Sequence, residues 1–318
     1  MNSPRVGIIG ARRSRQGLGP WVARFLKASG VEVACFLATG SETLQAAREE
    51  LGEKHGIEAR GYLDLEEMIR AEAPVALVIL SPSETHLAYL DAALGAGLHT
   101  LCEKPLVWGE RGLAEAAARI VLGYENRGLK LWENCPWPYT LPSYGGLFPG
   151  VLDAAPERFE MRLSPVSTGK QMLGDAMPHV LSLLQSLAPS ASVAIEAIGY
   201  STRQIDAPDL TVTFRYRAGE HLVNTEVRLV QAKSQPREAG YAVNGHWARR
   251  RIEMADYAIC FEAGKRRVSV PDPLGLLIAD FARDLASEAT TDNLRTRRIA
   301  QRMALLEQLT GAWGGESH

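Results

Sequence analysis

The sequence predicts an α/β protein in which a doubly wound parallel sheet is followed by a second, α+β domain. Over residues 1–134, short apolar runs alternate with longer helical patterns, which is typical of repeated strand–helix–strand units. These runs are continuously apolar, as expected of strands that are covered on both faces. After residue 158 several runs alternate between apolar and polar residues, which predicts a large, mostly antiparallel sheet with one open face.

Each element of the first domain has its own signal. Strands are expected over 5–10, 31–37, 75–80, 98–102 and 129–134. Helices are expected to begin at Gly19-Pro20, Ser41, Asp64 and Glu84, with a fifth over 110–127. Pro20 suits the start of a helix because its φ is preset and its missing N–H is not needed there. Ligands of such sheets bind at the carboxyl ends of the strands.

A segment rich in proline, glycine and aromatic residues, 135–150, ends this pattern. We therefore expect a first domain over 1–134 and a substrate-binding and oligomerisation domain over 135–318, whose C-terminal helices could also pack back on the first domain. In the second domain, strands are expected over 158–164, 192–200, 210–216, 221–230, 250–263 and 266–270, and helices over 174–188, 274–288 and 294–311.

The composition argues against several classes of protein. The net charge is -2, with no tail of a single sign, whereas binders of nucleic acid or anionic membranes need a basic field. No apolar run approaches the length of a transmembrane helix, and the N-terminus lacks the features of a signal peptide, so a cytoplasmic protein is expected. The cysteines lack metal-ligand spacing, and we expect buried free thiols and no metal site. They are Cys35, Cys102, Cys135 and Cys260.

The turn after the first strand is a candidate phosphate site. A dinucleotide fingerprint, G-x-G-x-x-G, would let the backbone approach a pyrophosphate, but the chain reads GARRSRQGLG over 10–19, and only its first glycine is in place. Three arginines nevertheless lie between a buried strand and a helix N-terminus, which itself favours anions. The expected phosphate-binding residues are Gly10, Ala11, Arg12 and Arg13. The alternative is a solvated basic loop.

The end of the second strand indicates which dinucleotide would bind. Enzymes that use NAD usually carry Asp or Glu here to hold the ribose hydroxyls, but the chain reads Leu37-Ala38-Thr39-Gly40-Ser41. Small hydroxyl residues opposite arginines would accommodate a 2′-phosphate, so NADP(H) is expected in preference to NAD(H). The alternative is that Thr39 and Ser41 only cap the next helix.

Two later loops carry further polar residues. Ser81-Pro82 begins the loop after the third clear strand, and His86 follows it; this histidine either packs against the loop or takes part in the site. Glu103-Lys104-Pro105 follows the next strand. A lysine held there beside Glu103 can donate a hydrogen bond to a substrate hydroxyl or to a cofactor ribose.

Three stretches carry a resemblance to a known family. They are VGIIGA at 6–11, SPSETHLAYLDAALGAGLHTLCEKPL at 81–106 and GDAMPHVLSLLQSL at 174–187. In order and spacing they resemble the glucose–fructose oxidoreductase/inositol dehydrogenase (Gfo/Idh/MocA) family. The third resembles the family's D-x-x-x-H motif on the first helix of the substrate domain.

The resemblance implies a Rossmann domain and assigns catalytic roles. Lys104 matches the lysine that contacts substrate and nicotinamide ribose, His179 the general acid/base, and Asp175 the carboxylate one turn before it. Positions 175 and 179 share a helix face, and an imidazole suits proton transfer near pH 7. The alternative for His179 is a core or surface histidine. The resemblance also implies a cis Lys104–Pro105 peptide.

Further contacts complete the expected site. Cofactor contacts are expected from Ser81, Pro82, His86, Glu103, Lys104 and Asn134. Trp137 and Tyr139 would either stack on a sugar-like substrate or pack the domain junction. Family members are commonly homodimers or homotetramers, and the open sheet face favours such self-association.

We therefore expect an NAD(P)-dependent enzyme that transfers a hydride between nicotinamide and a hydroxyl or carbonyl carbon of a sugar, a cyclitol or a related small molecule. One alternative is an NAD-dependent glycoside hydrolase of the same family, which would show no net cofactor turnover. The other is a non-catalytic ligand-binding relative. The incomplete glycine turn favours this last alternative, whereas Lys104 and His179 argue against it.

Overall fold

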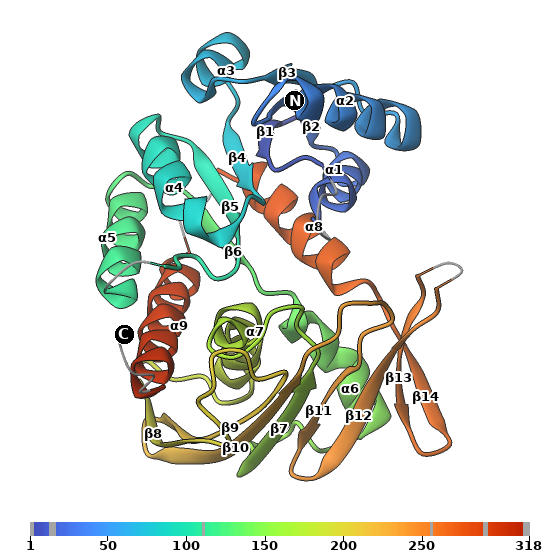
Figure 1. The fold of residues 1–318 in the computed structure, drawn as a ribbon, viewed down its shortest axis with the longest axis vertical. Helices are drawn as coiled ribbons and strands as arrows, with labels where there is room; N and C mark the ends of the chain where they lie inside the picture. The colour runs from blue at the N-terminus through green and yellow to red at the C-terminus, as the bar shows by residue number, and fades with distance from the viewer. Residues whose placement is uncertain (1–2, 13–16, 110–111, 255–256, 289–291, 314–318) are drawn as a thin grey trace. The chain divides into compact units, whose positions relative to one another are not determined.

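The computed structural model describes residues 3–12, 17–109, 112–254, 257–288 and 292–313. The chain divides into two compact units, Met1–Asn134 with Leu274–Ala300 and Cys135–Pro273 with Gln301–His318. The segment 274–300, which sequence analysis places in the second domain, thus groups with the first unit. It contains most of α8 (Pro273–Leu285) and the start of α9 (Asn293–Ala312) (Figure 1).

In the described part of the first unit, six parallel strands form a sheet in the order β3-β2-β1-β4-β5-β6. The strands are β1 (Arg5–Ile9), β2 (Glu32–Leu37), β3 (Arg60–Tyr62), β4 (Ala76–Ile79), β5 (His99–Glu103) and β6 (Leu131–Asn134). The order reverses between β1 and β4, which is where such sheets bind ligands. The five predicted strands are confirmed, and β3 was not predicted.

Helices flank this sheet on both faces (Figure 1). They are α1 (Gly19–Ala28), α2 (Ser41–His55), α3 (Leu65–Glu72), α4 (His86–Gly95), α5 (Leu113–Asn126) and α8. The predicted caps are confirmed in part. Asp64 accepts a hydrogen bond from the Glu67 backbone at 2.7 Å, and Pro20 lies in the first turn of α1.

In the described part of the second unit, eight strands form a sheet in the order β14-β13-β12-β11-β7-β10-β9-β8, and only the β7–β10 pair is parallel. The strands are β7 (Arg158–Leu163), β8 (Val193–Tyr200), β9 (Asp209–Ala218), β10 (His221–Val230), β11 (Ala239–Val243), β12 (His246–Ile252), β13 (Ile259–Ala263) and β14 (Arg266–Val270). The predicted fold class is confirmed. The single strand expected over 250–263 is wrong, because a turn separates β12 from β13, and β11 was missed.

One face of this second sheet is covered and the other is open. Along β10, Val223, Val227 and Leu229 are buried, whereas Glu226 and Arg228 between them are exposed. Helix α7 (Gln171–Leu187) packs against β7 and β10, and α6 (Leu141–Leu147) packs against β13 and β14. The alternation therefore separates a covered apolar face from a face that carries charged side chains.

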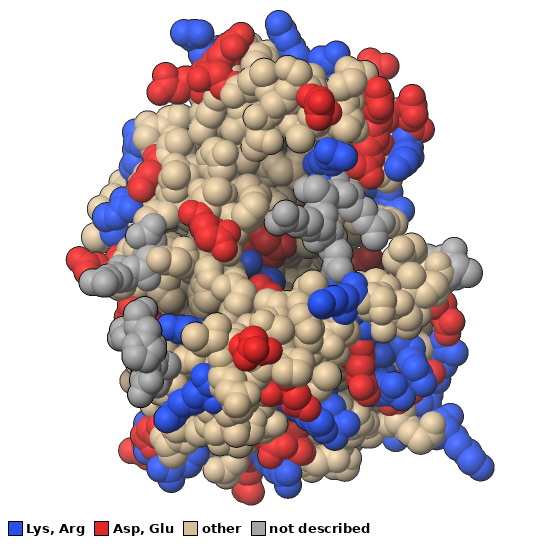
Figure 2. Space-filling view, viewed as in Figure 1, with Lys and Arg blue, Asp and Glu red and all other residues tan. Residues whose placement is uncertain are grey.

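The face of the molecule shown in Figure 2 carries no large area of a single charge sign. Basic and acidic side chains are interspersed over the face that Figure 2 shows. Among the described residues, no helix is both long and apolar enough to cross a membrane. The four cysteines are buried free thiols, as predicted. Within the same described ranges, no three histidine, cysteine or acidic side chains are grouped so that they could hold a metal ion.

The start of α1 lies directly against the turn after β1. A Cβ at Gly19 would lie 2.4 Å from the Gly10 carbonyl oxygen and 2.5 Å from the Ala11 carbonyl. These are backbone atoms, which cannot rotate away as a side chain would. Gly19 therefore provides the close helix–strand packing that the last glycine of a dinucleotide fingerprint provides.

We predict that Gly19→Ala destabilises the protein by about 1 to 3 kcal/mol, because the new methyl group overpacks backbone against backbone. Urea unfolding would measure the change. Gly52→Ala is the matched control: this residue lies in α2 with open space around its Cβ position, where alanine is the better helix former. Equal effects of the two substitutions would contradict the packing role of Gly19.

Candidate functional site

The turn after β1 also approaches the loop after β4. Gly10 has a φ of +87°, and a Cβ there would lie 2.7 Å from the Leu80 carbonyl oxygen and 2.9 Å from the Ser81 nitrogen. Glycine is required at this position both by the backbone conformation and by the space. The two loops at the switch point are therefore in backbone contact, with the N-terminus of α1 beside them.

The expected phosphate-binding residues fall in three different environments. Ala11 is buried, Arg12 is exposed, and Arg13 lies outside the described residues. The N-cap of α1 is Leu18, which supplies no side-chain hydrogen bond. A helix N-terminus without a side-chain acceptor retains its preference for an external anion.

The end of β2 presents two hydroxyl groups to solvent. Thr39 and Ser41 are exposed, and the N-cap of α2 is Gly40. The cap is completed by Thr43, whose Oγ1 accepts from the Gly40 backbone N–H at 3.0 Å. The alternative that Thr39 or Ser41 is the N-cap of this helix is therefore wrong. The Thr39 hydroxyl lies 3.4 Å from Thr43 Oγ1.

His86 ties two loops of the first unit together. Its side chain is fully buried. Its Nε2 lies 2.9 Å from the Ser81 carbonyl oxygen, and its Nδ1 lies 2.8 Å from the Pro105 carbonyl oxygen. Direct cofactor contact by His86 is not supported by this geometry, because both ring nitrogens face backbone carbonyls. Its role is to position the loops after β4 and β5, while exposed Pro82 lies at the surface of the first loop.

Three of the expected residues meet at the carboxyl ends of β5 and β6. Glu103 and Asn134 are partners in the strand register, and Asn134 Nδ2 donates to Glu103 Oε2 at 3.3 Å. The Lys104 backbone N–H donates to Glu103 Oε1 at 2.8 Å. The Lys104–Pro105 peptide is cis, as the family resemblance implied. Glu103 thus connects the lysine-bearing loop to the neighbouring strand.

The electrostatics of this cluster favour a polar ligand. Burial raises the pKa of the Glu103 carboxyl above its ordinary value, and the neighbouring Lys104 ammonium acts in the opposite direction. Asn134 is 2% exposed, and its Oδ1 has no hydrogen-bond partner among the described residues. A buried acceptor without a donor is costly, so a ligand hydroxyl or amide would fit beside it.

Sequence reasoning missed two residues that shape this edge. Glu133 is 5% exposed, and its Oε1 accepts from the Leu106 backbone N–H at 2.9 Å, which fixes the loop that carries Lys104. Its signal was an acidic residue at the end of an otherwise apolar strand. Gly19 is the second of these residues. The dinucleotide fingerprint places its last glycine five residues after its first, whereas the longer turn of this chain places Gly19 nine residues after Gly10.

In the second unit, α7 presents the expected acid–base pair. Asp175 and His179 are one turn apart and half-buried, whereas their neighbours on the helix are buried. The Ser167 hydroxyl donates to Asp175 Oδ2. Pro178 lies inside the helix and removes the N–H that would have bonded to the Gly174 carbonyl. The predicted shared helix face is confirmed, and Ser167 is an additional positioning residue.

Trp137 packs inside the second unit. It is 6% exposed, its ring meets the edge of Tyr241 at 6.0 Å between centroids, and the Arg250 guanidinium lies 5.1 Å from its ring centre. These contacts lie within the second unit, and the stacking of Trp137 on a substrate stays a prediction. Tyr139 is half-buried.

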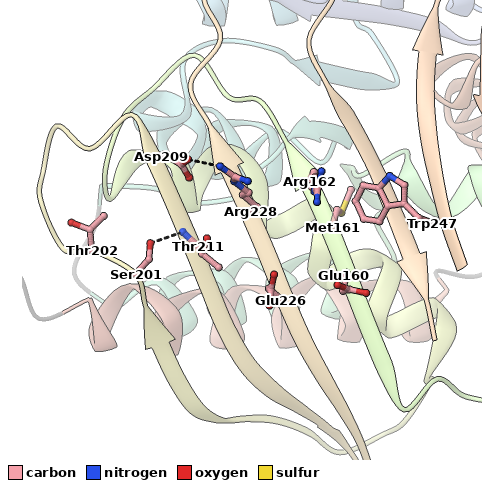
Figure 3. A pocket seen from close by; sticks show the side chains of 10 residues that line it. All are labelled: Glu160, Met161, Arg162, Ser201, Thr202, Asp209, Thr211, Glu226, Arg228 and Trp247. Atoms are coloured by element: carbon pink, nitrogen blue, oxygen red, sulfur yellow. Dashed lines mark hydrogen bonds and ion pairs between the residues drawn. The ribbon is translucent and has the colours of Figure 1, made fainter. Parts of the chain in front are cut away.

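A surface hollow lies on the open face of the second sheet (Figure 3). Two of its arginines have partners within the hollow. Arg228 forms an ion pair with Asp209 at 2.9 Å, and the Arg162 guanidinium lies 4.9 Å from the ring centre of Trp247. Because Asp175 and His179 belong to the helix on the covered face, this hollow does not contain the acid–base pair.

Comparison with known proteins finds a family that matches the N-terminal part of the chain. Residues 4–134 match the oxidoreductase family with an NAD-binding Rossmann fold, GFO_IDH_MocA. Over these residues the chain matches the Gfo/Idh/MocA family that its sequence motifs predicted.

Two curated relatives each match about 40% of the chain. A 1,5-anhydro-D-fructose reductase from Ensifer adhaerens is 31% identical over 130 residues, which cover 41% of this chain and 35% of the relative. An inositol 2-dehydrogenase from Paracoccus denitrificans is 32% identical over 127 residues, or 40% and 35% of the two chains. The matched stretch thus spans about a third of each relative.

Solved structures resemble the chain over almost its whole length. A 3-ketoreductase from Actinomadura kijaniata, solved with NADP, is 18% identical with a TM-score of 0.70 and covers 97% of both chains. A UDP-N-acetylglucosamine 3-dehydrogenase from Acidithiobacillus ferrooxidans is 20% identical with a TM-score of 0.66, covering 98% of this chain and 99% of that one. At this level of identity the likeness shows that the chain shares the fold of these structures, including the second sheet.

We predict that Glu103→Gln changes how stability depends on pH. Because the folded-state pKa of Glu103 is raised, wild-type stability should fall as the pH rises from the ordinary glutamate value of 4.5 through that folded pKa. The variant lacks this contribution, so the difference in unfolding free energy, variant minus wild type, should increase with pH. Urea unfolding from pH 4.5 to 8 measures it, with exposed Glu66→Gln as control. A difference that is flat with pH would refute the prediction.

Proposed function

We propose that the chain is an NAD(P)-dependent oxidoreductase that transfers a hydride between nicotinamide and a hydroxyl or carbonyl carbon of a sugar, a cyclitol or a related small molecule. The observation that carries the proposal is the cluster of Glu103, Lys104 and Asn134 at the carboxyl edge of a Rossmann sheet that matches the family. The substrate class is supported by the relatives, which are named for an anhydrofructose and for inositol.

The residues present fit a dinucleotide. Gly10 and Gly19 bring strand, turn and helix into backbone contact, and the N-terminus of α1 favours a pyrophosphate. The partnerless Asn134 Oδ1 and the Glu103 carboxyl are acceptors for polar groups of the ligand. When bound, the nicotinamide supplies or accepts the hydride.

The chain itself handles the substrate oxygen and its proton. In the direction of oxidation, the carbon gives up a hydride, and the hydroxyl proton passes to the His179 imidazole, which leaves a carbonyl group. The Lys104 ammonium donates a hydrogen bond to the same oxygen. Asp175, held by the Ser167 hydroxyl, orients the oxygen with its carboxylate. Reduction runs through the same steps in reverse.

The non-catalytic alternative loses its main argument. It depended on an incomplete glycine turn, and Gly19 supplies the close packing that the turn needs. We also propose that the open face of the second sheet, with the hollow of Figure 3, is the surface for homodimer or homotetramer assembly. Fluorescence titration of the full chain with NADPH and NADH tests the central proposal, and binding of neither would refute it.

We predict that NADPH binds more tightly than NADH. Arg12→Ala should weaken NADPH binding about 10- to 100-fold, the range for a hydrogen bond to a charged group, and should weaken NADH binding less, because NADH lacks the 2′-phosphate. The expectation follows from an exposed arginine at the turn and from the absence of an acidic residue over 38–41. Arg70→Ala, at an exposed position of α3, is the control. Tighter binding of NADH to the wild type would overturn the preference.

We predict that His179→Ala lowers kcat by about 10²- to 10⁴-fold, the usual contribution of a general acid or base, while the Kd for NADPH stays the same. Turnover would be followed as NADPH oxidation with 1,5-anhydro-D-fructose or as NADP+ reduction with myo-inositol. His246→Ala removes an exposed imidazole of the same unit and should retain activity. Unchanged turnover of His179→Ala would exclude the proposed role.

A further inference from the structure

Two arginines lie on the covered face of the second sheet. Arg250 of β12 is the register partner of Ala239 in β11, so its side chain shares the face of Tyr241, two residues further along β11. Arg237 lies two residues before the first residue of β11. Both arginines are half-buried, and this is the face against which α7 packs.

Each guanidinium has one nitrogen without a hydrogen-bond partner in the described part of the chain. These are the Nε atoms of Arg237 and Arg250, and both are buried. The open face differs. Arg228, Arg249 and Arg251 are paired with Asp209, Glu238 and Glu262 respectively.

The electrostatics of the pair agree with this picture. Burial and the positive charge of Arg237 lower the pKa of Arg250 to about 10, and Asp272 acts in the opposite direction. Burial also lowers the pKa of Arg237, against the field of Asp175. Two desolvated cations that repel each other are unfavourable unless an anion is supplied.

We propose that Arg237 and Arg250 bind an anionic group of the substrate, a carboxylate or a phosphate. Guanidinium groups match the geometry of both oxoanions. The guanidinium of Arg250 is held in place by a cation–π contact with the Trp137 ring. The inference rests on the proposed function and narrows its substrate to an acidic sugar or cyclitol derivative. Both arginines lie on the sheet face that α7 covers, and Asp175 of that helix acts on the pKa of Arg237.

Calorimetric titration of the full chain tests the anion site. The probes are D-gluconate for a carboxylate, D-glucose 6-phosphate for a phosphate, and D-glucose as the neutral reference. We predict that one of the two anions binds at least 10-fold more tightly than glucose. Arg250→Met and Arg237→Met should each lose about 10- to 100-fold of that affinity, and Arg250→Lys should regain part of it.

Arg251→Met is the matched control, because it removes the same charge from the next position of β12, on the opposite face. It should leave anion affinity unchanged. Equal binding of glucose and of both anions, or full affinity in the Arg237 and Arg250 variants, would overturn the inference. Arg237 lies outside the strands, whereas Arg250 lies within β12. If Arg250→Met does not fold, the anion affinity of Arg237→Met therefore tests the inference.

NADPH titration of the same samples separates the two proposals. Binding of NADPH without preference for either anion would refute the anion site and leave the oxidoreductase proposal standing. Anion binding that depends on Arg250, in a protein that binds neither NADPH nor NADH, would refute the oxidoreductase proposal instead.

Discussion

The backbone contact between Gly10 and Gly19 is the constraint on which the cofactor end of the first unit depends. It fixes the distance between the turn after β1 and the first turn of α1, and it does so through backbone atoms, which cannot rotate away. The long, arginine-containing segment between the two glycines therefore projects from a fixed base. Because Gly10 also touches the loop after β4, the same contact sets the position of Ser81 at the switch point.

From that base the carboxyl edge is built by side chains that bind backbone. His86 joins the loop after β4 to the loop after β5, and Glu133 anchors the latter through the Leu106 N–H. Glu103 then connects Lys104 to Asn134. A lysine held in this way loses less conformational freedom on binding than one on an unsupported loop, which is the advantage of a preorganised site.

Much of this could be predicted from the sequence, for a physical reason. Strands covered on both faces are continuously apolar, so the central strands of the first sheet were clear, and the i, i+4 spacing placed Asp175 and His179 on one helix face. The short strand β3 carries too few residues to show a pattern. Strand β11 is buried throughout and lacks the alternation that identified its neighbours. The packing role of Gly19 was not predicted, because the glycine motif was judged by its spacing along the sequence, which does not show backbone packing.

The arginine pair shows why the rest of the site needed coordinates. Arg237 and Arg250 are thirteen residues apart. Two neighbouring arginines, Arg249 and Arg251, lie on the open face and pair with acidic residues. A one-residue change in the register of β11 and β12 would exchange the two sets of side chains between faces. Only the observed pairing of Ala239 with Arg250 separates the arginines whose buried Nε lacks an acceptor among the described residues from the surface arginines, which have acidic partners. The substrate's charge is therefore encoded in strand register.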